Sequence, residues 1–149
     1  MAKKILVPID QSPMAEGIVP LVAAIAHGAG AKVRLLLVAP APQTRLGQDG
    51  RVVAYADQET ARLEAEGLDY LRTVMMRFGP AGGVECVVRF GDPVAEILRE
   101  AEAFGADLIA VTTQGRSALG RTVLGSVAEQ IVGKADAPVM LLRPGGHRS

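Results

Sequence analysis

Residues 108–132, LIAVTTQGRSALGRTVLGSVAEQIV, place a glycine-rich loop between two apolar segments. Leu108–Val111 is an aliphatic run typical of a buried strand, and Val127–Val132 has the spacing of a helix. The loop between them, Thr112–Ser126, contains three glycines and several hydroxyl groups. Free backbone N–H groups and the helix dipole favour negative charge at a helix start, so in an α/β protein such a loop is a place where phosphate can bind.

Four more aliphatic runs occur along the chain. They are rich in Val, Ile and Leu without clean alternation, which is typical of strands that are covered on both faces. These runs are Ile5–Ile9, Val33–Val38, Val84–Val88 and Val139–Leu142. Segments with helical spacing lie between the runs: Pro13–Gly28, Tyr55–Phe78, Asp92–Phe104 and Ser126–Gly133. This alternation predicts a single-domain α/β fold with an open parallel sheet and right-handed crossovers.

Capping signals mark the ends of two of these helices. Ser12 precedes Pro13, which suits the first helical position, and Gly28 and Gly30 are both suited to the end of the same helix. Asp92 stands in the same way before Pro93.

Two segments are expected to be irregular. Pro40–Val53 is rich in Pro, Gly and Gln and is predicted to be a mobile surface loop. We expect the domain to span residues 1–144, followed by a flexible tail at residues 145–149.

Composition excludes several classes of function. The 16 basic and 16 acidic residues balance, so no net field attracts nucleic acid or anionic lipid. Aromatic residues make up only 3% of the chain, which argues against a base-stacking platform. The longest apolar run, around Ile18–Ala26, is too short to span a bilayer. The lone Cys86 suits a reducing compartment, and because a predicted strand follows the N-terminus at once, we expect no signal peptide. We therefore expect a cytoplasmic protein without nucleic acid or membrane partners.

The last apolar run is expected to form an edge strand. Pro138 opens it, and a proline at the start of a strand is compatible with a sheet edge. An apolar edge without charge needs a cover. A second copy of the chain is the simplest cover, so we expect a homodimer through Val139–Leu142. The alternative is that the C-terminal tail folds over this edge.

Asp10 follows the first predicted strand. In open parallel sheets, ligands bind at the carboxyl ends of strands where the winding direction reverses. If the first and fourth strands are neighbours there, Asp10 and the loop Thr112–Ser126 face one crevice. The carboxylate could accept a hydrogen bond from a ribose hydroxyl or help to hold a divalent metal beside phosphates. Alternatively, it only favours the adjacent helix N-terminus. No metal site is expected from the protein side chains alone.

Ser126 has two interpretations as well. Ser126 and Glu129 match a capping box, and the serine hydroxyl could instead meet a phosphate. The loop is not a Walker P-loop, because no lysine precedes Ser126. Phosphate charge would have to be met by backbone amides, by Arg116 or by a metal ion, although Arg116 and Arg121 also fit solvated surface charges.

The sequence names no catalytic base. His27 lies near a predicted helix end and His147 lies in the tail, and neither has the partner pattern of a metal site or a triad. Cys86 falls within an apolar strand, where packing is the expected role. We therefore expect at most a slow enzymatic reaction.

Six segments together form a specific pattern: KILVPIDQS (4–12), GDPVAEIL (91–98), ADLIAV (106–111), GRS (115–117), LGSV (124–127) and APVMLL (137–142). With these segments the chain resembles the universal stress protein family over nearly all of its length. The resemblance implies an adenine nucleotide alpha hydrolase-like fold, with a five-stranded parallel sheet in the order 3-2-1-4-5 flanked by four helices. It also implies dimerisation through the last strand.

The resemblance further implies a nucleotide-binding subclass, whose motif is Gly-x-x-Gly, nine residues, then Gly-Ser or Gly-Thr. Gly115, Gly125 and Ser126 match this motif. By similarity, Asp10 would lie by the ribose and phosphates, and the backbone of Val38 would meet the adenine edge. The full set of nucleotide-binding residues implied is Pro8, Ile9, Asp10, Val38, Thr112, Gly115, Arg116, Gly125, Ser126 and Val127.

Thr112 departs from the motif, since it stands where the first glycine is expected. If this position needs a positive φ, a β-branched residue costs about 1–2 kcal/mol. If it is ordinary β backbone, its amide stays available and the cost is only steric.

Three functions are consistent with these observations, and the last is an enzyme that hydrolyses ATP slowly or transfers an adenylyl group. The first is a small dimeric stress-response regulator that binds ATP, with Mg²⁺ possible through Asp10, and presents a changed surface to an unknown protein partner. The second is a module for protein interaction that binds no nucleotide and uses its glycines for turn and capping geometry alone. The spaced pair of Gly115 and Gly125 favours the first, because a capping site needs no such spacing.

Overall fold

A five-stranded parallel sheet forms the centre of the computed structural model, which describes residues 3–42, 45–46, 52–54, 56–79, 83–112 and 126–143. Its strands are β1 (Lys4–Pro8), β2 (Lys32–Ala39), β5 (Val84–Phe90), β6 (Leu108–Thr112) and β7 (Val139–Leu142). Their spatial order is β5-β2-β1-β6-β7. Numbered along the chain within this sheet, the order is 3-2-1-4-5, as predicted.

The register of the strands matters for the site. β1 pairs with β2 on one side and with β6 on the other, so the winding direction reverses at β1 and β6. The last pair between β1 and β2 is Pro8 with Leu36. β2 continues to Ala39 and there pairs with β5 alone. One side of the β2 backbone is therefore uncovered by β1 beyond Leu36.

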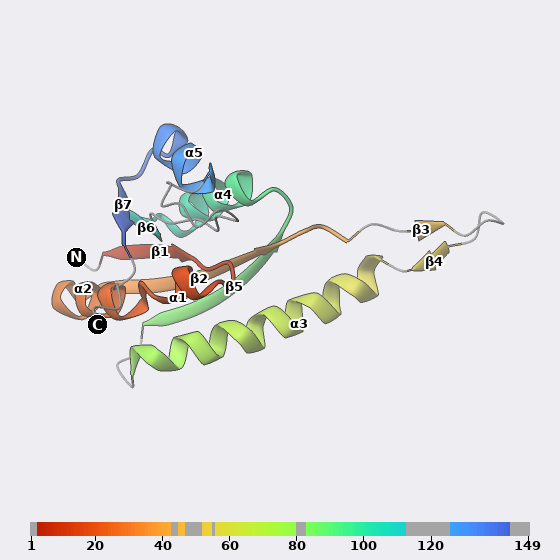
Figure 1. Cartoon of the computed structure of the whole chain (residues 1–149), viewed down its shortest axis with the longest axis horizontal. Helices are drawn as coiled ribbons and strands as arrows, with labels where there is room; N and C mark the ends of the chain where they lie inside the picture. Colours follow the sequence, from red (N-terminus) through yellow and green to blue (C-terminus); the bar gives the residue numbers. More distant parts are fainter. Residues whose placement is uncertain are drawn as a thin grey trace.

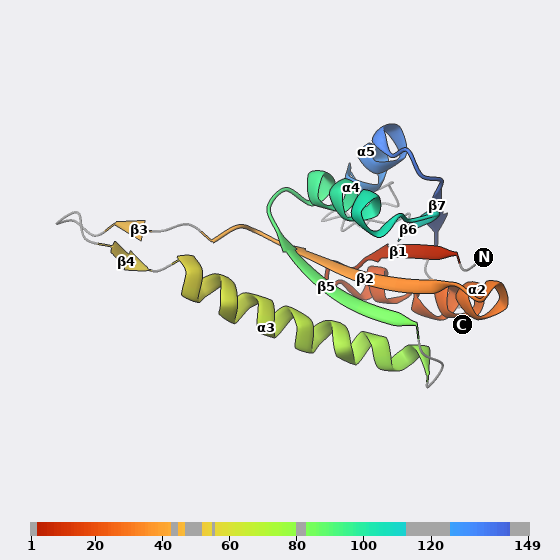
Figure 2. The ribbon, with the colours of Figure 1, turned by 180° about the vertical axis from the view of Figure 1, so that it is seen from behind.

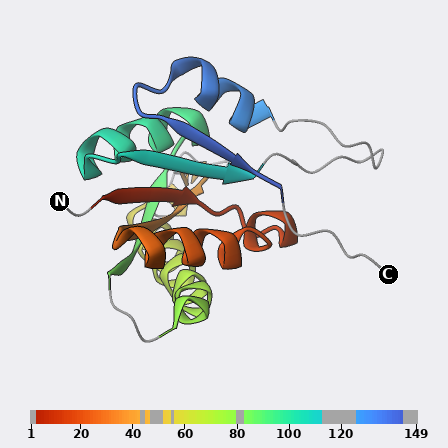
Figure 3. The same cartoon turned by 90° about the vertical axis from the view of Figure 1, so that its left-hand side faces the viewer.

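Helices cover both faces of the sheet (Figure 3). On one face lie α4 (Pro93–Phe104) and α5 (Ser126–Lys134). On the other lie α1 (Pro13–Glu16), α2 (Val19–Ala29) and α3 (Ala56–Met75), and α3 continues into a short 3₁₀ helix, η1 (Met76–Phe78). Each face has its own buried aliphatic cluster, as expected for strands that are covered on both sides. In the described part of the chain, no helix is long and apolar enough to cross a membrane.

The segment 13–28 is not one helix, as predicted, but two. α1 ends at Glu16, and α2 begins at Val19 with Pro20 in its first turn. Proline lacks an N–H group, and its ring clashes with the carbonyl four residues earlier, which here belongs to Glu16. Pro20 therefore prevents one continuous helix but suits the start of a new one.

Residues 40–53 contain structure that the sequence analysis missed. Arg45–Leu46 (β3) and Val52–Ala54 (β4) pair antiparallel as a separate two-stranded sheet. This pair lies beyond the N-terminal end of α3, away from the main sheet (Figures 1 and 2). Strands of two and three residues are too short to show a periodic hydrophobic pattern, which explains the error. The predicted tail falls outside the described residues.

The caps predicted at Ser12, Asp92 and Gly30 are confirmed, whereas Gly28, the other predicted stop, lies within α2. Ser12 Oγ accepts a hydrogen bond from Ala15 N at 3.1 Å, and Asp92 Oδ2 accepts one from Ala95 N at 2.9 Å. Gly30 ends α2 with a φ of 65°, a left-handed conformation that favours glycine.

Candidate functional site

A cavity of about 410 Å³ opens at the carboxyl ends of β1 and β6, where the winding direction reverses. Ligands bind at this position in open α/β sheets. Strands β1, β2 and β6 contribute to its walls, together with the starts of α4 and α5. Its described lining is Pro8, Ile9, Asp10, Ala15, Leu36, Val38, Pro93, Ile97, Val111, Thr112, Ser126, Val127 and Ala128.

The structure brings most of the predicted site residues together around this cavity. Those that line it are Pro8, Ile9, Asp10, Val38, Thr112, Ser126 and Val127. Gly115, Arg116 and Gly125 lie outside the described residues, so their predicted contacts with phosphate stay predictions.

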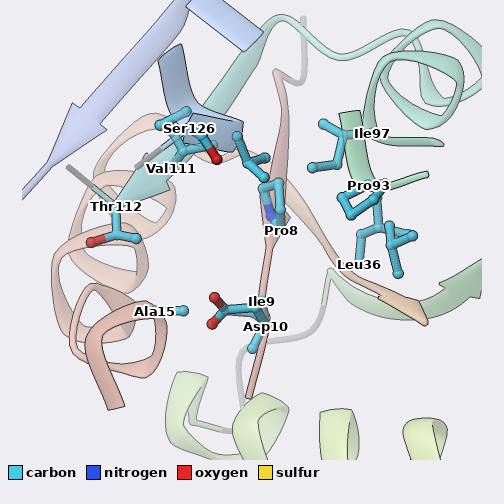
Figure 4. Close-up of a pocket in the computed structure, with 13 residues that line it drawn as sticks. Pro8, Ile9, Asp10, Ala15, Leu36, Pro93, Ile97, Val111, Thr112 and Ser126 are labelled. Carbon is cyan, nitrogen blue, oxygen red and sulfur yellow. The ribbon is translucent and has the colours of Figure 1, made fainter. Parts of the chain in front are cut away.

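The cavity has an apolar side and a polar side (Figure 4). Leu36, Pro93 and Ile97 face it from one side. Thr112 and Ser126 lie across from them, and the Asp10 carboxylate lies near the end of β1. A ligand that combines a flat apolar ring with a polar or anionic part matches this arrangement.

Asp10 lies in a tight turn that follows β1. Gln11 has a φ of 65°, which turns the chain sharply after Asp10. Asp10 Oδ1 accepts a hydrogen bond from Ser12 N at 3.0 Å. Within the described residues, Oδ2 takes part in no hydrogen bond, and Asp10 is exposed. The carboxylate thus shapes the turn with one oxygen and keeps the other available at the cavity.

The main chain of Val38 faces the cavity as well. Leu36 O accepts a hydrogen bond from Ile9 N at 2.8 Å, so the polar groups of Leu36 point toward β1. Ala39 O accepts one from Gly91 N at 2.9 Å, on the side of β5. Residues two apart in a strand point the same way, so the N–H and C=O groups of Val38 also point toward β1. β1 has already ended there, which leaves them directed at the open end of the cavity.

The backbone conformation of Thr112 decides whether the first glycine position of the motif has a positive φ or ordinary β geometry. It is the last residue of β6, paired with Leu142, and it does not have a positive φ. The position is therefore ordinary β backbone, where threonine is favoured. The conformational cost that a β-branched residue would pay in the left-handed region does not arise here.

Ser126 is exposed and is the first residue of α5. Among the described hydrogen bonds, none joins Ser126 to Glu129, so the capping box is not observed; Gln130 Nε2 instead donates to Ser126 O at 3.3 Å. The serine therefore lies at the cavity rim, at the positive end of the α5 dipole.

Sequence reasoning missed the apolar side of the cavity. Pro93 and Ile97 are four residues apart and so share one face of α4. Leu36 lies two residues before Val38 and so shares its face of the sheet. These spacings could have indicated the side chains once Val38 and the α4 start were assigned to the site. The remaining unpredicted lining residues are Ala15, Val111 and Ala128.

Asp10 is the one charged side chain in the described lining. In the same part of the chain, no group of three or more His, Cys, Asp and Glu residues gathers in a way that could hold a metal ion.

The profile of the Universal stress protein family matches residues 1–143. The chain belongs to the universal stress protein family. A universal stress protein of Thermus aquaticus is 31% identical over 146 residues, which cover 96% of this chain and all of the relative. The solved structure of MJ0577, a universal stress protein of Methanocaldococcus jannaschii, superposes with a TM-score of 0.79 at 26% identity and covers 99% of both chains.

Some solved structures of this fold contain adenine nucleotides. A universal stress protein in complex with cAMP has a TM-score of 0.67 at 22% identity, covering 96% of this chain and 98% of that one. A family member from Archaeoglobus fulgidus with dAMP gives 0.59 at 21%, with coverage of 96% and 98%. One from Arabidopsis thaliana with AMP gives 0.63 at 18%, with coverage of 97% and 93%. At these identities they relate to this chain by fold.

Proposed function

We propose that this universal stress protein binds an adenine nucleotide in the cavity between β1, β2 and β6. The observation that carries the proposal is the pairing of an apolar wall with main-chain groups of Val38 that are directed at the cavity. A purine ring needs both features, since its faces are apolar and its edge carries hydrogen-bonding groups. Val38 offers an N–H donor and a C=O acceptor side by side, which complement the ring nitrogen and exocyclic amine of adenine.

The rest of the nucleotide follows from this placement. With the base against Leu36, Pro93 and Ile97, the ribose comes to lie near the free oxygen of Asp10. The phosphates then extend toward Ser126 and the N-terminus of α5, where the helix dipole favours them. Gly115, Arg116 and Gly125 are the residues that we predict to enclose the phosphates.

A divalent ion suits this donor set. Mg²⁺ is commonly held by one or two carboxylates together with substrate phosphates. Asp10 supplies one carboxylate oxygen, and the described lining holds no cationic side chain to balance a triphosphate. We therefore propose that ATP binds with Mg²⁺. The family structures that hold cAMP, dAMP and AMP support a nucleotide of this class.

We propose a regulatory role in the stress response, carried out as a homodimer in the cytoplasm. β7 is an edge strand, and Leu141 at its centre is 39% exposed. Pro138 O accepts a hydrogen bond from Ile109 N at 2.9 Å, so residues 138 and 140 face β6. Val139 and Leu141 consequently direct their backbone groups at the open edge, where a second copy can pair with them.

Calorimetry with the purified protein tests nucleotide binding. We expect heat of binding on addition of AMP and on addition of ATP with Mg²⁺. When EDTA removes the Mg²⁺, ATP should bind more weakly. Asp10→Asn should lower the affinity for both on the order of tenfold, since the amide keeps the turn but loses the charge. Asp69→Asn is the matched control, because Asp69 is an exposed carboxylate paired with Arg72 on α3. No heat with any nucleotide at millimolar concentration would favour the interaction module that binds no nucleotide.

Sedimentation velocity tests the dimer. Leu141→Pro removes an N–H group that points away from β6, so the β6–β7 ladder stays intact while pairing across the edge is blocked. We expect a dimer for the wild type and a monomer for this variant. Leu141→Thr keeps the N–H group and serves as its control. A wild-type chain that sediments as a monomer at all concentrations contradicts the proposal.

A further inference from the structure

Two buried carboxylates lie beside the cavity and take no part in the binding proposed above. Glu96 and Glu100 are 6% and 3% exposed, one turn apart on the face of α4 that packs on the sheet. Burial of charge is costly unless each charged group is paired, and apolar residues of similar size often serve stability equally well. These two carboxylates therefore point to a role other than stability.

Arginines surround both carboxylates. Arg89 of β5 reaches Glu100 Oε1 through Nε at 2.5 Å and Glu96 Oε1 through Nη1 at 3.1 Å. Arg34 of β2 donates from Nη1 to Glu100 Oε2 at 2.5 Å. Arg99 donates to Glu96 Oε2. All four carboxylate oxygens are thus occupied, and Arg89 joins the two glutamates.

This network connects the same elements that form the apolar side of the cavity. On α4, Pro93 and Ile97 line the cavity while Glu96 and Glu100 enter the network. On β2, Val38 lines the cavity, and Arg34, four residues earlier on the same face, enters the network.

Arg89 itself lies directly opposite Val38 in the register between β5 and β2. Its side chain is 31% exposed and does not line the cavity. An effect of Arg89 on a ligand would therefore act through the position of α4.

The turn that precedes α4 is closely packed against this network. Gly91 has a φ of 136°, and a Cβ atom there would lie 3.3 Å from Glu96 Oε2. Gly91 N also donates to Ala39 O, the residue after Val38. The start of α4 is thus held to the end of β2 by a main-chain hydrogen bond, and the Glu96 carboxylate packs closely beside this turn.

We propose that Arg89 is a positioning residue which, through Glu96 and Glu100, sets the spacing between α4 and β2 and thereby the size of the base that the cavity accepts. This inference rests on the proposed nucleotide function. It predicts that the wild-type protein prefers AMP to an analogue with an enlarged base, and that loosening the network reduces this preference.

The test compares AMP with N6-benzyl-AMP by calorimetry at a temperature well below the melting transition. Arg89→Gln should bind AMP roughly tenfold more weakly, while its affinity for N6-benzyl-AMP changes little, so the ratio of the two dissociation constants falls about tenfold. Arg89→Lys keeps the charge but lacks the forked guanidinium that contacts both glutamates, so its ratio of dissociation constants should lie between those of the wild type and Arg89→Gln. If Arg89→Gln does not fold, the lysine variant decides.

Arg62→Gln is the matched control, because Arg62 also bridges two glutamates, Glu59 and Glu66, but on the exposed face of α3. The ratio of the dissociation constants for AMP and N6-benzyl-AMP in this variant should equal that of the wild type. A purely stabilising role for Arg89 would lower the melting temperature and leave the ratio unchanged, which overturns the inference. A wild type that binds neither nucleotide instead defeats the proposed function, and the inference with it.

Discussion

Tyr70 of α3 donates its hydroxyl hydrogen to Glu16 Oε2 at the end of α1. Arg77 Nη2 approaches the other oxygen of the same carboxylate, Oε1, at 3.0 Å. α1 also contains Ala15, which lines the cavity. The contact between Tyr70 and Glu16 therefore connects the long helix α3 to the cavity wall that follows Asp10.

Tyr70→Phe should destabilise the fold by about 1–2 kcal/mol, since a hydrogen bond to a carboxylate is lost while the ring still packs. Chemical denaturation with urea measures the change. Arg72→Gln, which removes an exposed ion pair with Asp69 on the same helix, should change the free energy of unfolding by less than about 0.5 kcal/mol. Equal effects of the two substitutions contradict the role that we assign to Tyr70.

The same contact makes stability depend on alkaline pH. Burial, together with the hydrogen bond to Glu16, raises the pKa of Tyr70 well above its usual value. The unfolded chain releases this proton near its ordinary pKa of about 10, so the contribution is fully present below that pH and is lost as pH rises further. The difference in unfolding free energy between wild type and Tyr70→Phe should therefore shrink above about pH 10. A difference that stays constant to pH 12 would be evidence against the raised pKa.

Gly91→Ala should destabilise the protein by about 1–3 kcal/mol. The φ of 136° is unfavourable for an L-residue, and the added methyl crowds the Glu96 carboxylate. Gly28→Ala is its counterpart, because Gly28 lies within α2 with open space around it. Alanine has the higher helix propensity, so this variant should gain up to about 1 kcal/mol in the free energy of unfolding. Thermal and urea unfolding of both variants give the comparison, and a neutral Gly91→Ala is the unexpected result.

Thr112→Gly restores the glycine of the family motif, yet we expect it to change the affinity for AMP by less than about threefold. Position 112 has β backbone, so glycine gains no conformational advantage there. The substitution should instead lower stability by about 0.5–1 kcal/mol, through the entropy of the unfolded chain. Calorimetric titration of both proteins measures the affinity. A tenfold gain would show that the threonine side chain obstructs the ligand.

Cys86 should react slowly with a thiol reagent at pH 8. Burial raises the pKa of its thiol, and its sulfur lies 3.9 Å from Met75 Sδ in the contact between β5 and α3. Labelling of the folded protein should be at least about tenfold slower than labelling of the same chain in urea. Because the chain has one cysteine, the extent of labelling reports on Cys86 alone. Equal rates in the two states count against burial of the thiol.

Local patterns were sufficient for most of the fold. Each of the five aliphatic runs became a strand of the main sheet, because strands buried on both faces need continuous apolar sequence. Ser12 and Asp92 cap the helices that they precede, since capping involves only neighbouring residues. The order of the strands came from the family resemblance, and the structure confirms it. The errors, at Pro20 and in residues 40–53, concern short elements that lack a periodic signal.

In the candidate site, too, some residues are indicated by local sequence patterns and others depend on the tertiary structure. Asp10 and Ser126 were identifiable because each stands in a strand–loop–helix unit with a recognisable pattern. The role of the Val38 main chain is implied only by the family resemblance, since its direction depends on β1 ending before β2 does.

Nor did any pattern within one segment connect Arg89 with Glu96 and Glu100, because the packing of α4 on β2 and β5 brings them together. Hydrophobic periodicity and capping act over a few residues and can be recognised in the chain itself. Pairing of buried charges and exposure of strand edges arise only when segments far apart in sequence meet in the folded protein.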